Sequence, residues 1–287
     1  MSKKTEIKAL ISLLDDEDDV IVNNVSNKLL SYGEQVIFNL ENSWEKTVNP
    51  IVHERIEEII HKIQFKTIYN SLENWLRDPF PDLYKGAEIV AKYQFPDLDS
   101  ESTRNIVEGI KQKVWLELNN DLTPLETINV FNHVFYGYLG FKGDYKSKVD
   151  VSDFCINHLL ETKKGASITL GILYVFIAQE LNLPIYGVNL HRHFILSYQI
   201  RFIEKFDQNY STESMFYINA MNKGIVFERE EIKSYLKKME KEVEDKFFSP
   251  ASNKEVINEL LSYVWHYFKS NKQEDRAAEI EQLRNLF

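Results

Sequence analysis

The N-terminal part of the chain has hydrophobic positions that recur at the spacing of amphipathic helices. One stripe runs from Ile7 to Leu14, an acidic run follows at Asp15-Asp-Glu-Asp-Asp19, and a second stripe continues from Val20 to Leu30. This pattern predicts a helical hairpin whose acidic turn caps the second helix through the positive end of its dipole.

A second hairpin is predicted about 31 residues further along, with Asn49-Pro50 as the break between its helices. Three hydrophobic positions of the first hairpin recur in the second, as the pairs Val25 and Ile56, Tyr32 and Ile63, and Ile37 and Ile68. The pattern resembles a pair of HEAT-like repeats, and an ordinary antiparallel helical bundle is the alternative. In either case these hairpins are expected to offer a face for protein contacts.

Two prolines one residue apart, in Asp78-Pro-Phe-Pro-Asp-Leu83, mark the clearest break in the helical pattern because neither can continue a helix. A new module is therefore expected from residue 79. Helices are predicted over 84–93, 102–118 and 123–138. Two more are predicted between Val151 and Leu183, with a break at Lys163-Lys164-Gly165.

After Leu183-Pro184 the hydrophobic period falls from about 3.6 to 2 residues, which predicts strands over 185–190, 193–202, 216–219 and 224–227. The connections are too short for helical crossovers, so the sheet is expected to be antiparallel. A charged helix is predicted from Glu228 to Asp245, and two further helices from Ser252 to Leu286. The predicted fold class is α+β. It comprises helical hairpins over 1–78, helices packed on a small antiparallel sheet over 79–248, and a helical tail over 249–287.

Composition narrows the classes of function. The 287 residues are 44% hydrophobic and 27% charged, which suits a protein with packed cores. A formal net charge of −10 does not attract a phosphate backbone, so no nucleic-acid partner is expected. The longest mainly apolar stretch, Ile168 to Leu183, is shorter than the roughly 20 residues that cross a bilayer. We expect no membrane association and, since no apolar leader follows Met1, a cytoplasmic location.

The chain has one cysteine, Cys155, which excludes an internal disulfide and a cysteine-rich zinc site. Its apolar neighbours Phe154, Ile156 and Leu159 predict a buried structural thiol. Pairing of this thiol with His158 or His193 would require a different fold.

Two histidines, His191 and His193, alternate on a predicted strand and so face the same side, where they would offer two ligands to one metal ion. Two ligands are too few for a protein metal site. A third would have to come from His158, Asp153 or a glutamate elsewhere, so no metal and no cofactor is expected.

Several motifs carry a resemblance to a known family. They are Gly86-Ala-Glu-Ile-Val-Ala-Lys-Tyr-Gln-Phe-Pro-Asp-Leu-Asp99, Gly140-Phe-Lys-Gly143, Asn157, Leu160-Glu161, Lys164-Gly165-Ala-Ser-Ile-Thr-Leu170, Leu181-Asn-Leu-Pro184, Gly187-Val188 and His193-Phe194. Over residues 84–240 the chain resembles the bacterial transglutaminase-like family of the Sir-B type. That family is similar in fold to transglutaminases and papain-like proteases. The resemblance implies a helix with the nucleophile at its N-terminus, packed on an antiparallel sheet that carries a histidine and then an aspartate.

The resemblance assigns three positions to a catalytic triad. The interval from Ser167 to Pro184 matches the usual interval from the catalytic cysteine of transglutaminases to their Gly-Ile-Pro turn, so a serine occupies the nucleophile position. His193 stands where the superfamily has its histidine, and Asn219 stands where it usually has its aspartate. The usual Pro-Gly-His-Phe reads His191-Arg192-His193-Phe194 here, and Asp-Pro-Phe reads Asn219-Ala220-Met221.

These departures disfavour the ordinary thiol mechanism. A helix N-terminus stabilises a thiolate, but an effect of about 0.3–1 kcal/mol is too small to activate a hydroxyl without a well-placed base. The simplest interpretation of Ser167 is a helix N-cap, with nucleophile or ligand contact as alternatives. Thr169 is expected to be a residue of the first turn without chemistry.

We therefore expect a transglutaminase-like protein without conventional catalysis that acts as a binding or scaffold module for a protein or peptide partner. The alternative is a slow amide hydrolase or acyl transferase that uses Ser167, His193 and Asn219. A third possibility retains the cleft as a binding site for a peptide or small molecule, to which His193 contributes a hydrogen bond.

Overall fold

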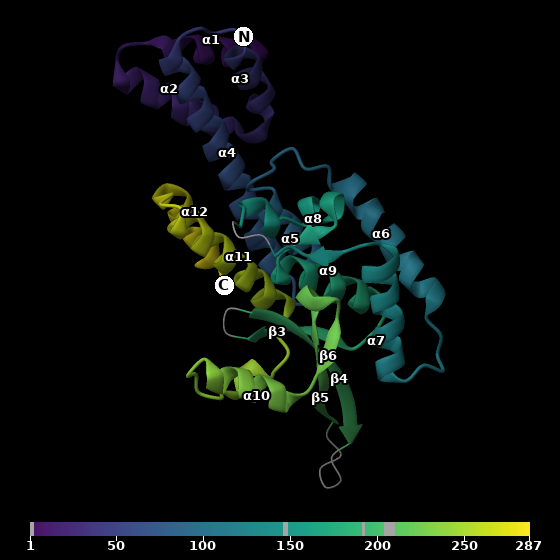
Figure 1. Ribbon diagram of the computed structural model, residues 1–287. Helices are drawn as coiled ribbons and strands as arrows, with labels where there is room; N and C mark the ends of the chain where they lie inside the picture. The colour runs from purple at the N-terminus through teal and green to yellow at the C-terminus, as the bar shows by residue number, and fades with distance from the viewer. Residues whose placement is uncertain (1–2, 146–148, 191–192, 204–209) are drawn as a thin grey trace. The chain divides into compact units, whose positions relative to one another are not determined.

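The computed structural model describes residues 3–145, 149–190, 193–203 and 210–287 (Figure 1). The chain forms two compact units, Met1–Asn74 and Trp75–Phe287. The division falls inside helix α4 (Pro50–Arg77), and the expected boundary at residue 78 lies one position beyond the end of that helix.

The first unit contains α1 (Lys3–Ser12), α2 (Asp19–Tyr32), α3 (Ile37–Trp44) and most of α4, close to the predicted helices. The carboxylate of Asp18 accepts a hydrogen bond from the backbone of Val20 and so caps α2 from within the acidic run. Asn49 accepts from the backbone of Ile51 and caps α4, which has Pro50 at its first position. Apolar residues from all four helices form one core: Ile7, Ile11, Leu14, Val25, Leu29, Val36, Leu40, Val52, Ile56, Ile59 and Ile63.

The recurring hydrophobic positions lie in elements of different length. Val25 and Tyr32 are on α2 and Ile37 begins α3, with a tight turn between the two helices. Their counterparts in the second hairpin all lie on the continuous helix α4. The HEAT-like assignment therefore stays a prediction.

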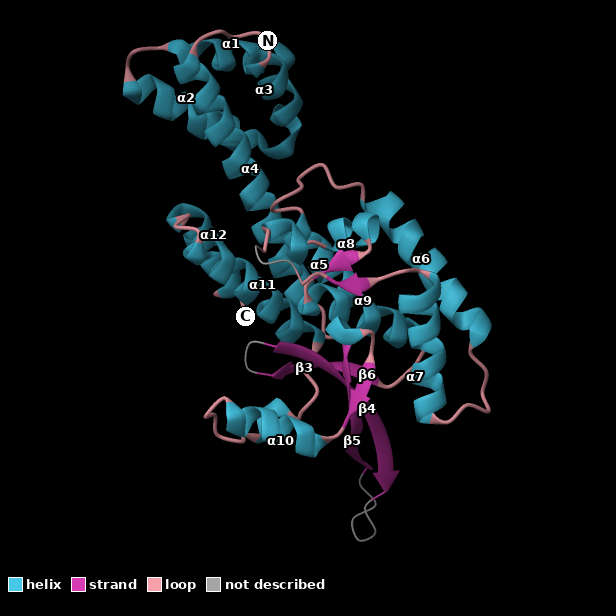
Figure 2. Ribbon diagram, viewed as in Figure 1, coloured by secondary structure: helices cyan, strands magenta, loops and turns pink. Residues whose placement is uncertain are grey.

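The second unit contains a four-stranded antiparallel sheet, so the α+β fold class is confirmed for it (Figure 2). The sheet has the order β3 (Ile185–Leu190), β4 (His193–Ile203), β5 (Tyr210–Asn219) and β6 (Ile225–Phe227). Strand β5 starts earlier than the predicted residue 216. Its first half, Tyr210-Ser-Thr-Glu-Ser214, is mostly polar and so lacks the hydrophobic alternation on which the prediction relied.

Helix α9 (Ser167–Glu180) is the centre of the second unit. Its residues from Ile168 to Ala178 are buried on every side, and it packs against β3, β4 and α5 (Leu83–Ala91). The other helices are α6 (Ser100–Glu117), α7 (Pro124–Asn132), α8 (Ile156–Thr162), α10 (Arg229–Lys238), α11 (Asn253–Ser270) and α12 (Glu274–Arg284). A short parallel pair, β1 (Lys142–Gly143) and β2 (Lys164–Gly165), precedes α9.

Two details of the C-terminal part differ from the expectation or refine it. Helix α10 ends at Lys238 rather than near Asp245, because the chain turns at Glu240, which has a left-handed φ of 54°. The tail helices form inside the second unit, where α11 packs against α5, α9 and β3. None of the helices in the described part of the chain has both the length and the apolar composition that a bilayer crossing requires.

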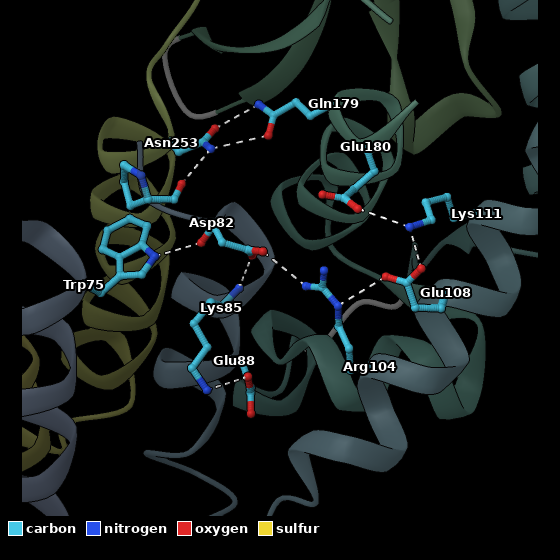
Figure 3. Close-up of polar contacts among 11 residues, drawn as sticks. Trp75, Asp82, Lys85, Glu88, Arg104, Glu108, Lys111, Gln179, Glu180 and Asn253 are labelled. Atoms are coloured by element: carbon cyan, nitrogen blue, oxygen red, sulfur yellow. Dashed lines mark hydrogen bonds and ion pairs between the residues drawn. The ribbon is translucent and has the colours of Figure 1, made fainter. Parts of the chain in front are cut away.

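A chain of polar contacts fastens α5, α6 and α9 together (Figure 3). Asp82 caps α5 and also pairs with Arg104 of α6, at 3.1 Å between Oδ2 and Nη1. Arg104 pairs with Glu108, and Lys111 connects Glu108 with Glu180 at the end of α9. These contacts tie α5 and α6 to each other and to the C-terminal end of α9.

Candidate functional site

A cavity of about 810 Å³ lies at the N-terminal end of α9. Ser167 of α9, His193 of β4 and Asn219 of β5 all line it, so the fold brings together the three residues that the motifs single out. Many of the other lining side chains are apolar, among them Val149, Phe154, Ile195, Ile225, Phe227 and Ile232. The catalytic role of the three positions stays a prediction.

Ser167 is not the N-cap of α9, so that interpretation was wrong. The cap is Ala166, which has no side-chain oxygen, and Ser167 is the first helical residue. The side chain of Ala166 makes no capping hydrogen bond to the first turn of α9. The serine hydroxyl is therefore not used as a cap, and it belongs to a residue that lines the cavity.

The start of α9 is held by one carbonyl group. The backbone oxygen of Asp153 accepts a hydrogen bond from the Ala166 N–H at 3.4 Å and one from the Thr169 hydroxyl at 2.8 Å. Thr169 is buried in the first turn, as expected, and its hydroxyl ties the helix to the segment before α8. These two bonds hold the first turn of α9 in place and so fix the position of Ser167 in the cavity wall.

His193 is positioned by its neighbour in β4. Phe194 is buried against two glycines, and a methyl group at Gly171 or Gly187 would lie 2.5 or 2.4 Å from its ring. Only glycine leaves room for this close packing of α9, β3 and β4. The exposed His193 ring stands edge-on to Tyr235 of α10, with 5.5 Å between ring centres.

The predicted pairing of His191 with His193 cannot be placed, because His191 lies outside the described residues. In the ranges that the structure describes, no group of three histidine, cysteine or acidic side chains is arranged to hold a metal ion.

Asn219 ends β5 and caps the turn that follows it. Its Oδ1 accepts a hydrogen bond from the Asn222 N–H at 3.1 Å. The turn is braced by Tyr136, which donates to the Ala220 carbonyl at 2.9 Å, and by Tyr145, which donates to the Met221 carbonyl at 2.7 Å. An amide held in this way can orient a ring but carries no negative charge to stabilise an imidazolium.

Tyr263 of α11 is a lining residue that the sequence did not reveal. Its hydroxyl is buried and has no partner in hydrogen-bond geometry within the described residues. Burial, and after it the charge of Glu259, raise the pKa of Tyr263 well above its usual value. The neighbouring Ser167 side chain lowers this pKa by a smaller amount. The phenol therefore stays protonated beside Ser167. No motif marks Tyr263, because it lies in a helix predicted as part of a separate tail.

Cys155 does not line the cavity. It precedes α8 as its N-cap residue, is 3% exposed, and donates a weak hydrogen bond to the Val151 carbonyl at 3.6 Å. Burial, with added effects of the Asp150 and Asp153 charges, raises the pKa of the thiol to about 12. The prediction of a buried thiol is confirmed.

The chain is similar to several known proteins. A model of the transglutaminase-like superfamily matches residues 101–262. The chain is 22% identical to a UPF0162 protein of Xylella fastidiosa over 218 residues, 74% of this chain and 73% of that protein. It is 30% identical to a UPF0162 protein of Pasteurella multocida over 116 residues, 38% of this chain and 44% of that protein.

A more distant similarity is to F-box only protein 21 of Homo sapiens, 23% identical over 164 residues, which are 49% of this chain and 26% of that protein. No solved structure matches the chain.

Proposed function

The chain belongs to the transglutaminase-like superfamily, and from this premise we propose that it is a catalytically degenerate member that acts by binding a protein or peptide. The observation that carries the proposal is that the thiol of Cys155 does not line the cavity at Ser167. Ser167 lines the cavity, whereas the chain's single thiol is buried elsewhere. We further propose that the chain is of the Sir-B type and works in the cytoplasm.

His193, Asp144 and Glu231 line the cavity, but the third position of the predicted triad holds a neutral side chain. A serine hydroxyl needs a base that takes its proton and a third group that stabilises the resulting imidazolium. At the third position Asn219 offers a neutral amide, whose oxygen already accepts from Asn222. The arrangement therefore favours binding over turnover.

The lining of the cavity suits a peptide. Apolar side chains such as Ile195, Ile225 and Phe227 would receive an apolar side chain of the ligand. The Ser167 hydroxyl would bond the ligand backbone, with the buried Tyr263 hydroxyl behind it, and His193 would contribute a further polar group. Because Tyr263 comes from α11, we propose that the tail of residues 249–287 completes the site in the 79–248 domain.

The first unit supplies a second contact face in this proposal. We propose that its hairpins, over 1–78, act in the manner of HEAT-like repeats. Apolar side chains that remain exposed on this unit support that role, with exposed fractions of 73% for Phe38, 94% for Val48 and 56% for Ile51.

A displayed peptide library tests the binding role of the cavity. Peptides selected on the native protein are expected to bind Ile225→Trp at least about tenfold more weakly, because the indole fills the cavity. Met215→Trp is the matched control, since Met215 is equally exposed on the neighbouring strand and does not line the cavity. Failure to enrich any peptide, or equal binding by both variants, would contradict the proposal.

A slow acyl transfer or amide hydrolysis is the second candidate. It is supported by the shared cavity of Ser167, His193 and Asn219. A serine-reactive phosphonate tests it, because an activated Ser167 would be labelled in the native protein and not in His193→Ala. Absence of labelling counts against this candidate and leaves the binding role intact.

A further inference from the structure

A second cavity, of about 490 Å³, lies in the second unit and shares no lining residue with the cavity at Ser167. It forms where the connection between α5 and α6, residues 94–99, meets α8 and the start of α6. Asn157 and Glu161 of α8 line it from one side. Segments of the chain that are about 60 residues apart in sequence thus line one cavity.

The charged residues that line this cavity are all acidic. Asp97, Asp99 and Glu161 line it, and none of its described lining residues is basic. The carboxylate of Asp99 caps α6 by accepting from the backbone of Glu101 and Ser102, so it is already engaged. Asp97 and Glu161 are exposed at the rim and supply negative charge to an incoming group.

A buried polar group provides an independent indication of a ligand. Asn157 is only 5% exposed, and its side-chain oxygen has no hydrogen-bond partner among the residues that the structure describes. A buried acceptor of this kind is ordinarily satisfied, so a donor is expected at this position. A donor that also carries positive charge would satisfy both the amide and the carboxylates.

The rest of the wall is apolar. Phe95, Pro96, Leu98, Ile106 and Leu160 line the cavity beside the polar groups. Lysine and arginine place an apolar stem against such a surface while the charged end bonds polar partners. An apolar wall of this kind favours a cation with a hydrocarbon stem over a bare metal ion.

We propose that this cavity binds an alkyl-linked organic cation, such as the side chain of a lysine or arginine of a partner protein. The donors of the cation bond Asn157, Asp97 and Glu161, and its stem lies on the apolar wall. The inference does not depend on the proposed function of the Ser167 cavity, and each site is tested by different variants.

Nuclear magnetic resonance with small probes tests the proposal on the full chain. Acetyl-lysine-methylamide and acetyl-arginine-methylamide are titrated into ¹⁵N-labelled protein, and acetyl-norleucine-methylamide serves as the uncharged match. We expect saturable shifts of the amides of residues 95–102 and 157–161, with a Kd on the order of 1 mM and at least tenfold weaker binding of the norleucine probe. Comparison of the two cationic probes distinguishes ammonium from guanidinium.

Variants connect the shifts to the cavity. Asp97→Asn with Glu161→Gln is expected to weaken the cationic probes at least tenfold. Glu117→Gln with Asp121→Asn removes the same charge from exposed residues outside the cavity and should leave binding unchanged. Asn157→Ala should weaken binding at least threefold. If that variant does not fold, the double variant of Asp97 and Glu161 provides the test.

Three results would overturn the proposal. They are equal binding of the norleucine probe, shifts that spread without saturation over the acidic surface, and equal losses in the two double variants.

Discussion

Two helix starts in the same unit carry a thiol and a hydroxyl, Cys155 and Ser167, that differ in their surroundings. Cys155 precedes α8 and is enclosed by apolar residues, whereas Ser167 begins α9 and lines an open cavity. The thiol keeps a raised pKa of about 12 although it stands at a helix N-terminus. Burial outweighs the helix dipole here, so position at a helix start does not by itself make a reactive cysteine.

The largest expected effect compares thiols at the two positions. Cys155 of the native protein should react with iodoacetamide at pH 8 about 10³-fold more slowly than the cysteine of Ser167→Cys combined with Cys155→Ala. The reason is that a pKa of about 12 leaves a thiolate fraction near 10⁻⁴, against about a quarter at the usual value.

Time courses by mass spectrometry measure both rates, and native protein unfolded in urea is the control that restores ordinary reactivity to Cys155. Reaction rates within tenfold of each other in the folded proteins would contradict the contrast between the two sites.

The packing behind the Ser167 end of α9 is tested next. Gly171→Ala should lower the free energy of unfolding by about 1–3 kcal/mol, because its methyl group would lie 2.5 Å from the Phe194 ring. Gly109→Ala, in α6 with open space around it, should instead raise the free energy by up to about 1 kcal/mol. Urea unfolding measures both. Stabilisation by Gly171→Ala would show that Phe194 does not lock β4 to α9.

The effect of Cys155 on stability can be measured by comparing the pH dependence of unfolding in the native protein and in Cys155→Ala. Its raised pKa means that the folded state retains a proton that the unfolded thiol releases. The contribution is fully present below the unfolded pKa of about 8.5 and is lost as pH rises from there towards 12. Native protein should therefore lose about 1.4 kcal/mol per pH unit more than Cys155→Ala above pH 9. Parallel urea titrations at pH 8 to 10 that give the same slope for both proteins would refute a burial-raised pKa.

The smallest effect concerns the bond that holds the start of α9. Thr169→Val should cost about 1 kcal/mol, because it removes one hydrogen bond to the Asp153 carbonyl while the Ala166 N–H still satisfies that oxygen. Ser249→Ala removes an exposed hydroxyl bond in the same unit and should change stability by less than about 0.5 kcal/mol. Equal effects in thermal unfolding would remove the special role of Thr169.

The hydrophobic pattern predicted α9, where Ile168 to Ala178 is almost entirely apolar, and it predicted β3 from the fall in period after Pro184. It missed the polar half of β5, where pairing with β4 rather than burial defines the strand. Motif order indicated that Ser167, His193 and Asn219 belong together, and they line one cavity.

Two features of the site could not be predicted from the sequence. Tyr263 joins the cavity only through tertiary packing of α11, which leaves no local pattern. The cap of α9 lies at Ala166 rather than Ser167, because the Asp153 carbonyl and Thr169 hold the helix start in place of a capping side chain. A one-residue shift of this kind is set by contacts from another segment.

The most direct test of the central claim is a search for acyl transfer at Ser167. Native protein and Ser167→Ala are incubated with a library of peptides and an amine donor, and hydrolysed or amine-linked products are counted by mass spectrometry. The account predicts that the native protein forms no product above the level of Ser167→Ala. Product that forms with the native protein and disappears in both Ser167→Ala and His193→Ala would contradict it.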